Sequence, residues 1–148
     1  MRDLVIDASV VVEWYSPNRE RPDLNSYALP LRQAALEEQV HLHVPHIFDV
    51  EISARLLRLY RRDMLGRGRL ETAINELAMI PFKVYSFADA APPDYVAIGM
   101  RWNLAVYDAV YFALAQRLAL PLATVDGGLL TAIASFGKAE GVEKWMAA

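Results

Sequence analysis

An apolar run near the N-terminus ends at a carboxylate, and this feature constrains the fold more than any other. Residues 4–6 (Leu-Val-Ile) predict a buried strand, and Asp7 follows them directly. A second apolar segment comes next, which we interpret as a short helix capped by Ser9 and ending at Trp14 or Tyr15. A buried, ionised carboxylate is unfavourable unless a positive charge compensates it. Because ligands bind at the carboxyl ends of parallel strands, we expect Asp7 to be part of a site.

Length and composition predict a single ordered domain, residues 1–148. The chain is 55% hydrophobic and 22% charged, which is typical of a globular protein with a substantial core. Its net charge of −3 gives no general attraction for nucleic acid, so a surface for a polyanion has to be a local patch. The chain contains no cysteine, which excludes disulfides and thiolate metal sites.

Neither a signal peptide nor a membrane-spanning helix is expected. Asp7 interrupts the first apolar run, and the longest apolar region, residues 104–125, contains Asp108, Arg117 and Pro121. The expectation is a cytoplasmic protein that does not enter the membrane.

Turn-forming and capping residues divide the chain into strands that alternate with helices. The predicted strands are residues 4–6, 40–44, 83–87 and 122–125, with an edge strand at 142–146. The predicted helices are residues 9–15, 25–39, 47–65, 70–79, 92–102 and 108–120, with a short last helix after 127–128. Pro30 is expected within the first turn of its helix, and residues 66–68 are expected to form a turn. Helices between strands imply crossover connections, so the prediction is an α/β domain with a mostly parallel sheet.

Four carboxylates are placed to meet at the same edge of this sheet. Asp7 and Asp126 each follow a buried strand, while Glu51 and Asp108 lie near the starts of helices. Four carboxylates in one crevice repel one another unless a cation neutralises them. Oxygen ligands without cysteine favour a hard divalent cation, Mg²⁺ or Mn²⁺.

Each carboxylate also has an ordinary structural interpretation. Asp108 alone would be a helix cap, Asp126 a turn residue and Glu51 a solvated helix residue. Asp7 is the hardest to explain in this way, because apolar residues flank it on both sides. The four together are more specific than any one of them.

Four short motifs, in order along the chain, resemble the PIN-domain family and, more narrowly, the VapC-type toxins of bacterial and archaeal toxin–antitoxin pairs. They are Val5-Ile6-Asp7-Ala8-Ser9, Val50-Glu51 with Leu56, Tyr107-Asp108-Ala109 with Tyr111 and Ala113-Leu114-Ala115, and Thr124-Val125-Asp126 with Leu129. The resemblance implies a PIN-like, Rossmann-like three-layer domain with helices flanking the sheet. It also implies a metal-dependent endoribonuclease that cleaves RNA, is held inactive by a protein antitoxin and forms a homodimer.

The resemblance also assigns roles to residues of the predicted site. Asp7, Glu51, Asp108 and Asp126 are its catalytic and metal-binding set, with Mg²⁺ or Mn²⁺ as cofactor. The two hydroxyl residues that match the family pattern help to shape the site; they are Ser9 and Thr124. The position of Asp126 varies within the family, so its assignment depends most on the structure.

The densest basic segment follows Glu51. Arg55, Arg58 and Arg62 lie at helical spacing from it, where they could follow the phosphate backbone of an RNA. The alternative is an ordinary solvated helix face.

Two further features have less specific interpretations. His41 and His43 share one face of a strand, but without a third ligand they are interpreted as polar flanks of an edge strand. Apolar residues of the first helices are expected to form an exposed groove for the antitoxin; they are Trp14, Tyr15, Leu29, Leu36, Leu56, Leu57 and Tyr60.

Two other functions are weighed against the nuclease. An aspartyl phosphotransferase with Asp7 as nucleophile usually has a second aspartate two residues later, where this chain has Ser9. A non-catalytic PIN-like scaffold for RNA or protein does not require four carboxylates, and all four are present here.

Overall fold

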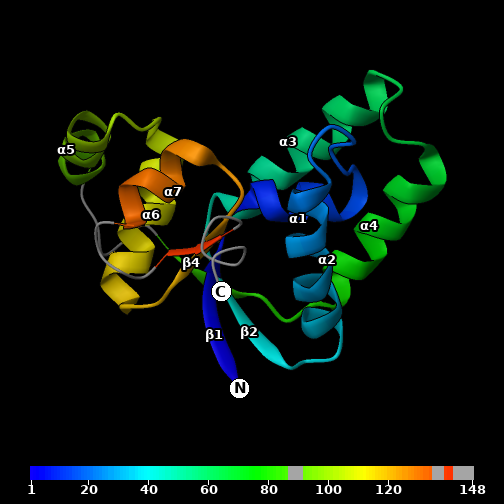
Figure 1. The fold of residues 1–148 in the computed structure, drawn as a ribbon, viewed down its shortest axis with the longest axis horizontal. Helices are drawn as coiled ribbons and strands as arrows, with labels where there is room; N and C mark the ends of the chain where they lie inside the picture. The colour runs from blue at the N-terminus through cyan, green and yellow to red at the C-terminus, as the bar shows by residue number, and fades with distance from the viewer. Residues whose placement is uncertain (87–91, 135–138, 142–148) are drawn as a thin grey trace.

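Five parallel strands form the central sheet of the part of the chain that the structure describes, in the order β3-β2-β1-β4-β5 (Figure 1). This computed structural model describes residues 1–86, 92–134 and 139–141. The strands are β1 (Arg2–Ile6), β2 (Val40–Pro45), β3 (Lys83–Tyr85), β4 (Leu122–Thr124) and β5 (Ala139–Gly141). Every pairing between neighbouring strands is parallel, which confirms the predicted type of sheet.

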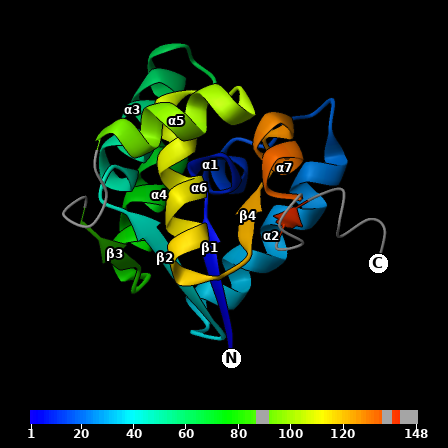
Figure 2. The same ribbon diagram turned by 90° about the vertical axis from the view of Figure 1, so that its left-hand side faces the viewer.

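Helices cover both faces of the sheet and complete a three-layer α/β fold (Figures 1 and 2). Helices α1 to α4 lie on one side, and α5 to α7 lie on the other. Their bounds are α1 (Ala8–Tyr15), α2 (Pro22–Leu36), α3 (Phe48–Arg61), α4 (Arg67–Met79), α5 (Pro92–Trp102), α6 (Val106–Leu118) and α7 (Gly127–Ala134). Within the described residues, no helix is both long and apolar enough to cross a membrane.

Strand β1 lies in the middle of the sheet, which explains its uninterrupted apolar sequence. Leu4, Val5 and Ile6 are buried because helices cover both faces. Val5 pairs with Leu122 of β4 on one side and with His43 of β2 on the other. The residue that follows β1 is therefore held at the centre of the carboxyl edge, where connecting segments from several elements come together.

The second helix begins earlier than predicted. It starts at Pro22, because a proline has no backbone donor to lose at the first helical position. Pro30 consequently lies inside α2 and not in its first turn. Proline there removes the hydrogen bond to the Ser26 carbonyl, and both residues are exposed, so water can solvate that carbonyl.

Other boundaries differ by a few residues. Helix α3 ends at Arg61, and Gly66 caps α4 at its N-terminus, so the turn precedes residues 67–68. Helix α6 begins at Val106, two residues before the predicted start. Strands β3 and β4 end at Tyr85 and Thr124. The predicted strand at 142–146 and residue 87 lie outside the described residues.

The histidines near β2 are accounted for by structural contacts. His43 is buried, with Nδ1 2.8 Å from the Tyr85 hydroxyl and Nε2 2.8 Å from Asp3 Oδ1. His41 is exposed, 3.3 Å from the same carboxylate. The prediction of an edge strand is wrong, because β2 lies between β1 and β3. A buried, fully paired imidazole in an interior strand supports packing and is not available as a metal ligand.

Candidate metal centre

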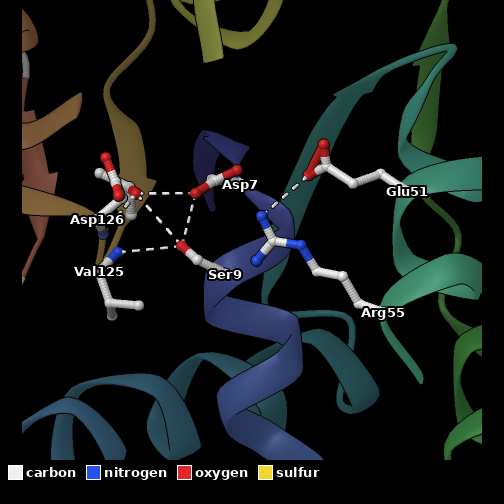
Figure 3. Close-up of polar contacts among 7 residues, drawn as sticks. Asp7, Ser9, Glu51, Arg55, Val125 and Asp126 are labelled. Atoms are coloured by element: carbon white, nitrogen blue, oxygen red, sulfur yellow. Dashed lines mark hydrogen bonds and ion pairs between the residues drawn. The ribbon is translucent and has the colours of Figure 1, made fainter. Parts of the chain in front are cut away.

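Asp7 lies at the carboxyl end of β1 with only 1% of its surface exposed. Its backbone N–H donates to the Ala123 carbonyl of β4 at 2.9 Å. Its Oδ2 accepts hydrogen bonds from the hydroxyls of Ser9 at 2.5 Å and Thr124 at 2.9 Å (Figure 3). The other oxygen, Oδ1, has no hydrogen-bond partner among the described residues. The carboxylate is thus fixed through one oxygen while the second stays available to a ligand.

The hydroxyls of Ser9 and Thr124 join the ends of β1 and β4. Ser9 Oγ accepts from the Val125 N–H at 3.3 Å, and Thr124 Oγ1 accepts from the Asp126 N–H at 3.0 Å. Each hydroxyl therefore donates its single proton to Asp7. The prediction that Ser9 caps α1 is wrong: Asp7 occupies the N-cap position, and no side chain caps this helix end. Ser9 is the second helical residue, which lets its hydroxyl reach back to the strand end.

The pKa values of Glu51 and Asp108 are both raised in this crowded environment. Burial, followed by the negative charge of Asp7, raises the pKa of Glu51 to about 7. Burial, followed by the charges of Asp7 and Asp126, raises the pKa of Asp108 to about 6. Burial also raises the pKa of Asp7, against the two hydroxyl donors. Four carboxylates from four segments of the chain therefore interact across one crevice.

Glu51 and Asp108 each lie in the first turn of a helix, α3 and α6. Glu51 Oε1 is buried and has no hydrogen-bond partner among the described residues. Asp108 does not cap its helix, because Ala105 holds the N-cap position. The solvated-helix interpretation of Glu51 and the cap interpretation of Asp108 are therefore wrong.

Asp126 has a structural role that the other three carboxylates lack. It directly precedes α7, and its Oδ2 accepts a hydrogen bond from the Leu129 N–H at 2.9 Å, as an N-cap does. The side chain is exposed, and its charge raises the pKa values of both Asp7 and Asp108. Asp126 therefore caps a helix and contributes negative charge to the crevice.

Arg55 places a positive charge beside this cluster. It lies one helical turn after Glu51 on α3, with Nη2 3.8 Å from Glu51 Oε1 (Figure 3). Its charge acts to lower the pKa values of Asp7, Glu51 and Asp108. Arg55 therefore interacts with carboxylates on three different elements.

A pocket of about 500 Å³ adjoins the carboxylates between α3 and α6. Glu51, Asp108 and Arg55 line it, together with Arg58 and Tyr107. The aromatic side chain of Tyr107 is 62% exposed. Of the three arginines singled out in the sequence, two thus line the pocket, while Arg62 caps the far end of α3 and is exposed.

Sequence reasoning assigned no role to Tyr111, although the residue is part of a quoted motif. It is completely buried, and its hydroxyl has no hydrogen-bond partner among the described residues. Burial and the charge of Glu51 raise its pKa, so the phenol stays protonated. The only signal was its position three residues after Asp108, on the same helix face.

The donor set fits a hard divalent cation. Two buried carboxylate oxygens, Asp7 Oδ1 and Glu51 Oε1, have no hydrogen-bond donor in the described part of the chain. Burial and the charges of neighbouring carboxylates raise the pKa values of Asp7, Glu51 and Asp108, a cost that a cation removes. In residues 1–86, 92–134 and 139–141, no three Asp, Glu or His side chains already surround one point closely enough to hold an ion.

The exposed apolar surface on the first helices is smaller than the sequence predicted. Trp14, Tyr15 and Leu56 are core residues with exposures of 3–4%. The exposed members are Leu29, Leu57 and Tyr60, and Leu36 is half-buried. An apolar groove of about 430 Å³ does lie between α3 and α4; its apolar lining residues are Phe48, Ile52, Leu56, Leu57, Leu70, Ile74, Leu77, Ala78 and Phe82.

Comparison with known families identifies the domain. The family model for the PIN domain matches residues 4–134, which include all four carboxylates. The chain belongs to the PIN-domain family. This result confirms the family resemblance found in the sequence motifs.

Curated relatives include proteins named as VapC ribonucleases. Ribonuclease VapC9 of Mycobacterium tuberculosis is 36% identical over 92 residues, which cover 57% of this chain and 65% of that protein, just under two thirds of its length. Ribonuclease VapC3 of Pyrobaculum aerophilum is 27% identical over 125 residues, covering 83% of this chain and 88% of VapC3.

A solved structure supports the fold. The crystal structure of PAE2754 from Pyrobaculum aerophilum aligns over 99% of this chain and 93% of its own, with a TM-score of 0.60 and 19% identity. At this level of identity the similarity concerns the arrangement of the backbone.

Proposed function

We propose that this protein is an endoribonuclease that requires Mg²⁺ or Mn²⁺ and acts as the toxin of a toxin–antitoxin pair. The observation that carries the proposal is the Asp7 carboxylate, which is buried at the centre of the carboxyl edge with Oδ1 lacking a donor among the described residues. The names of the PIN-domain relatives as ribonucleases support RNA as the substrate.

Asp7, Glu51 and Asp108 would hold the ion, with Asp126 contributing charge and a further oxygen. When bound, a divalent ion supplies charge neutralisation on the phosphoryl group and lowers the pKa of a water molecule. Within the protein, Ser9 and Thr124 hold Oδ2 of Asp7 and so direct Oδ1 into the crevice.

The pocket beside the carboxylates supports binding of a phosphate backbone and a base. Arg55 and Arg58 present positive charge along α3, and the exposed ring of Tyr107 offers a surface on which a base can stack. Arg62 extends the same basic face toward the end of α3. Arg55, Arg58 and Tyr107 line the same pocket as Glu51 and Asp108, as cleavage of a bound strand requires.

The antitoxin is proposed to cover the groove between α3 and α4. This groove combines a buried apolar floor with exposed Leu57 and Ile74, as a helix-binding groove does. We also expect a homodimer, which light scattering of the purified protein tests directly.

The alternative of a non-catalytic scaffold is not favoured. A scaffold gains nothing from burying Asp7, Glu51 and Asp108 near one another, because burial and the charges of neighbouring carboxylates raise their pKa values and disfavour the ionised forms. Such a cost is typical of active sites.

The test compares RNA cleavage by the wild type with that of Asp7→Asn and Asp49→Asn. Asp49 is an exposed carboxylate of α3 that lines the apolar groove and not the carboxylate pocket, so it controls for the loss of a surface charge. The wild type and Asp49→Asn should cleave RNA with Mn²⁺ and stop in EDTA, whereas Asp7→Asn should be inactive. Undiminished cleavage by Asp7→Asn, or by the wild type in EDTA, would refute the proposed mechanism.

Toxicity is tested separately by expressing the same three chains in a bacterial host. Growth arrest with the wild type and Asp49→Asn, and normal growth with Asp7→Asn, is expected. Arrest by Asp7→Asn would separate toxicity from the carboxylate site.

A further inference from the structure

Arg55 occupies a position that the RNA-binding role alone does not explain. A side chain that only tracks phosphates is expected to point outward, yet the guanidinium of Arg55 points toward Glu51, on the side facing Asp7 (Figure 3). Its side chain is 38% exposed, while the side chain of its partner Glu51 is only 13% exposed. The positive charge therefore lies at the mouth of the carboxylate crevice.

The contact between the two side chains is an ion pair without a hydrogen bond. Nη2 of Arg55 lies 3.8 Å from Glu51 Oε1, and that oxygen has no hydrogen-bond partner among the described residues. The pair gains charge compensation but no directional bond, so a competing cation can replace it at low cost.

The charge of Arg55 reaches beyond this one pair. It stabilises the ionised forms of Asp7 at the end of β1 and of Asp108 on α6, in addition to Glu51. A divalent ion held by these three carboxylates would be attracted by the same negative charges that Arg55 compensates. Because the guanidinium and a divalent ion carry charges of the same sign, Arg55 has to move away when the ion binds.

We propose that Arg55 is the resident counter-ion of the carboxylate cluster, competes in cis with the divalent cation, and is displaced from Glu51 when the ion binds. This inference rests on the proposed metal-dependent function and adds a regulation of that site. The displaced guanidinium remains on α3 beside the pocket, where it can contact a substrate phosphate. Arg55 thus lowers the affinity for the metal in the absence of RNA, and RNA that engages Arg55 favours metal binding.

The test is a titration of the purified full chain with Mn²⁺. Binding is measured by calorimetry and by the electron paramagnetic resonance signal of the free ion. The variants are Arg55→Met, which keeps the apolar stem, Arg55→Gln, which keeps a polar end, and Arg55→Lys, which keeps the charge. Arg58→Met is the matched control, because Arg58 lines the same pocket one turn further along α3. Titration at about pH 8 keeps protons from competing at Glu51.

Both neutral variants should bind Mn²⁺ about tenfold more tightly than the wild type, as expected for removing one positive charge next to a partly buried divalent ion. Arg55→Lys and Arg58→Met should remain within about twofold, because each keeps a charge at position 55. The two neutral replacements guard against a folding defect in one of them. Equal or weaker binding by both would overturn the role of Arg55.

The same titration separates this inference from the proposed function. If the wild type and the variants at Arg55 and Arg58 bind Mn²⁺ with the same measurable affinity, and Asp7→Asn does not bind, the metal site is supported and the role of Arg55 is refuted. If none of them binds Mn²⁺, both the metal-dependent function and the inference fall. Binding by the neutral variants alone would support the competition most strongly.

Discussion

Replacement of Asp7 by asparagine should stabilise the metal-free protein and at the same time remove its response to metal. Asp7 is 1% exposed, and burial raises its pKa despite two hydroxyl donors. In the variant, the amide oxygen can accept both hydrogen bonds from Ser9 and Thr124 that Oδ2 accepts in the wild type. The change therefore removes a buried charge and its repulsion of Glu51 without loss of these contacts.

The size of the effect follows from opposing terms. Burying a carboxylate without a cation costs several kcal/mol, which the two charge-assisted hydrogen bonds offset only in part. The amide NH₂ that replaces Oδ1 is itself a buried polar group and opposes part of this stabilisation. The net increase in the free energy of unfolding is therefore about 2 kcal/mol. For a chain of this length, that gain raises the Tm by about 6 °C.

Thermal unfolding followed by circular dichroism provides the assay, at about pH 8, which is above the pKa values of Glu51 and Asp108. In EDTA, Asp7→Asn should melt above the wild type. With saturating Mn²⁺ the wild type should gain about 3 kcal/mol, as expected for a ligand at about 100 times its Kd, while the variant gains nothing. The surface control Asp49→Asn should follow the wild type within about 0.5 kcal/mol in both buffers. A variant that melts below the wild type in EDTA, or that gains stability from Mn²⁺, would refute the reasoning.

Three further predictions concern the surroundings of the site. Because the pKa values of Glu51 and Asp108 are raised to about 7 and about 6, the folded protein binds protons more readily than the unfolded chain, and metal-free stability should fall as pH rises from about 4 to about 7. Urea unfolding in EDTA at several pH values measures this, and a rising or flat stability profile would contradict it. Thr124→Val removes one hydrogen-bond donor to Asp7, so it should lower the free energy of unfolding in urea by about 1–2 kcal/mol and the rate of RNA cleavage about tenfold. Unchanged stability and unchanged cleavage would show that the Ser9 hydroxyl alone is sufficient. Arg32→Met breaks the ion pair that joins α2 to Glu76 of α4, and should cost about 1 kcal/mol with unchanged Mn²⁺ affinity; a change in affinity would mean that this pair acts on the site.

Local patterns determined the order and type of the elements from β1 to α7 correctly, because each depends on nearby residues. Strand β5 at Ala139–Gly141 was not predicted. Short apolar runs ended by a polar or turn-forming residue predicted strands β1, β2 and β4, and helical periodicity predicted α3 and α6. Boundaries were less accurate. Pro30 lies inside α2 because its exposed position allows water to solvate the carbonyl that proline leaves unpaired, and exposure is not visible in a local pattern.

Residue types and spacing were enough to single out the four carboxylates of the site. A charge directly after a buried strand needs a compensating partner, and the parallel arrangement brings Asp7 and Asp126 to the same edge. Positions near the starts of helices added Glu51 and Asp108, and the family motifs contain all four carboxylates. These inferences depend on residue types and on their order along the chain.

The contacts that each of these groups makes are visible only in the folded chain. It placed the hydroxyls of Ser9 and Thr124 on one oxygen of Asp7, used Asp126 to cap α7, and buried Tyr111 next to the cluster. It also brought the guanidinium of Arg55 to Glu51, where the sequence predicted an arginine directed at RNA. The physical reason is that hydrogen bonds, burial and charge compensation depend on distances between segments far apart in the chain, which spacing along the sequence does not specify.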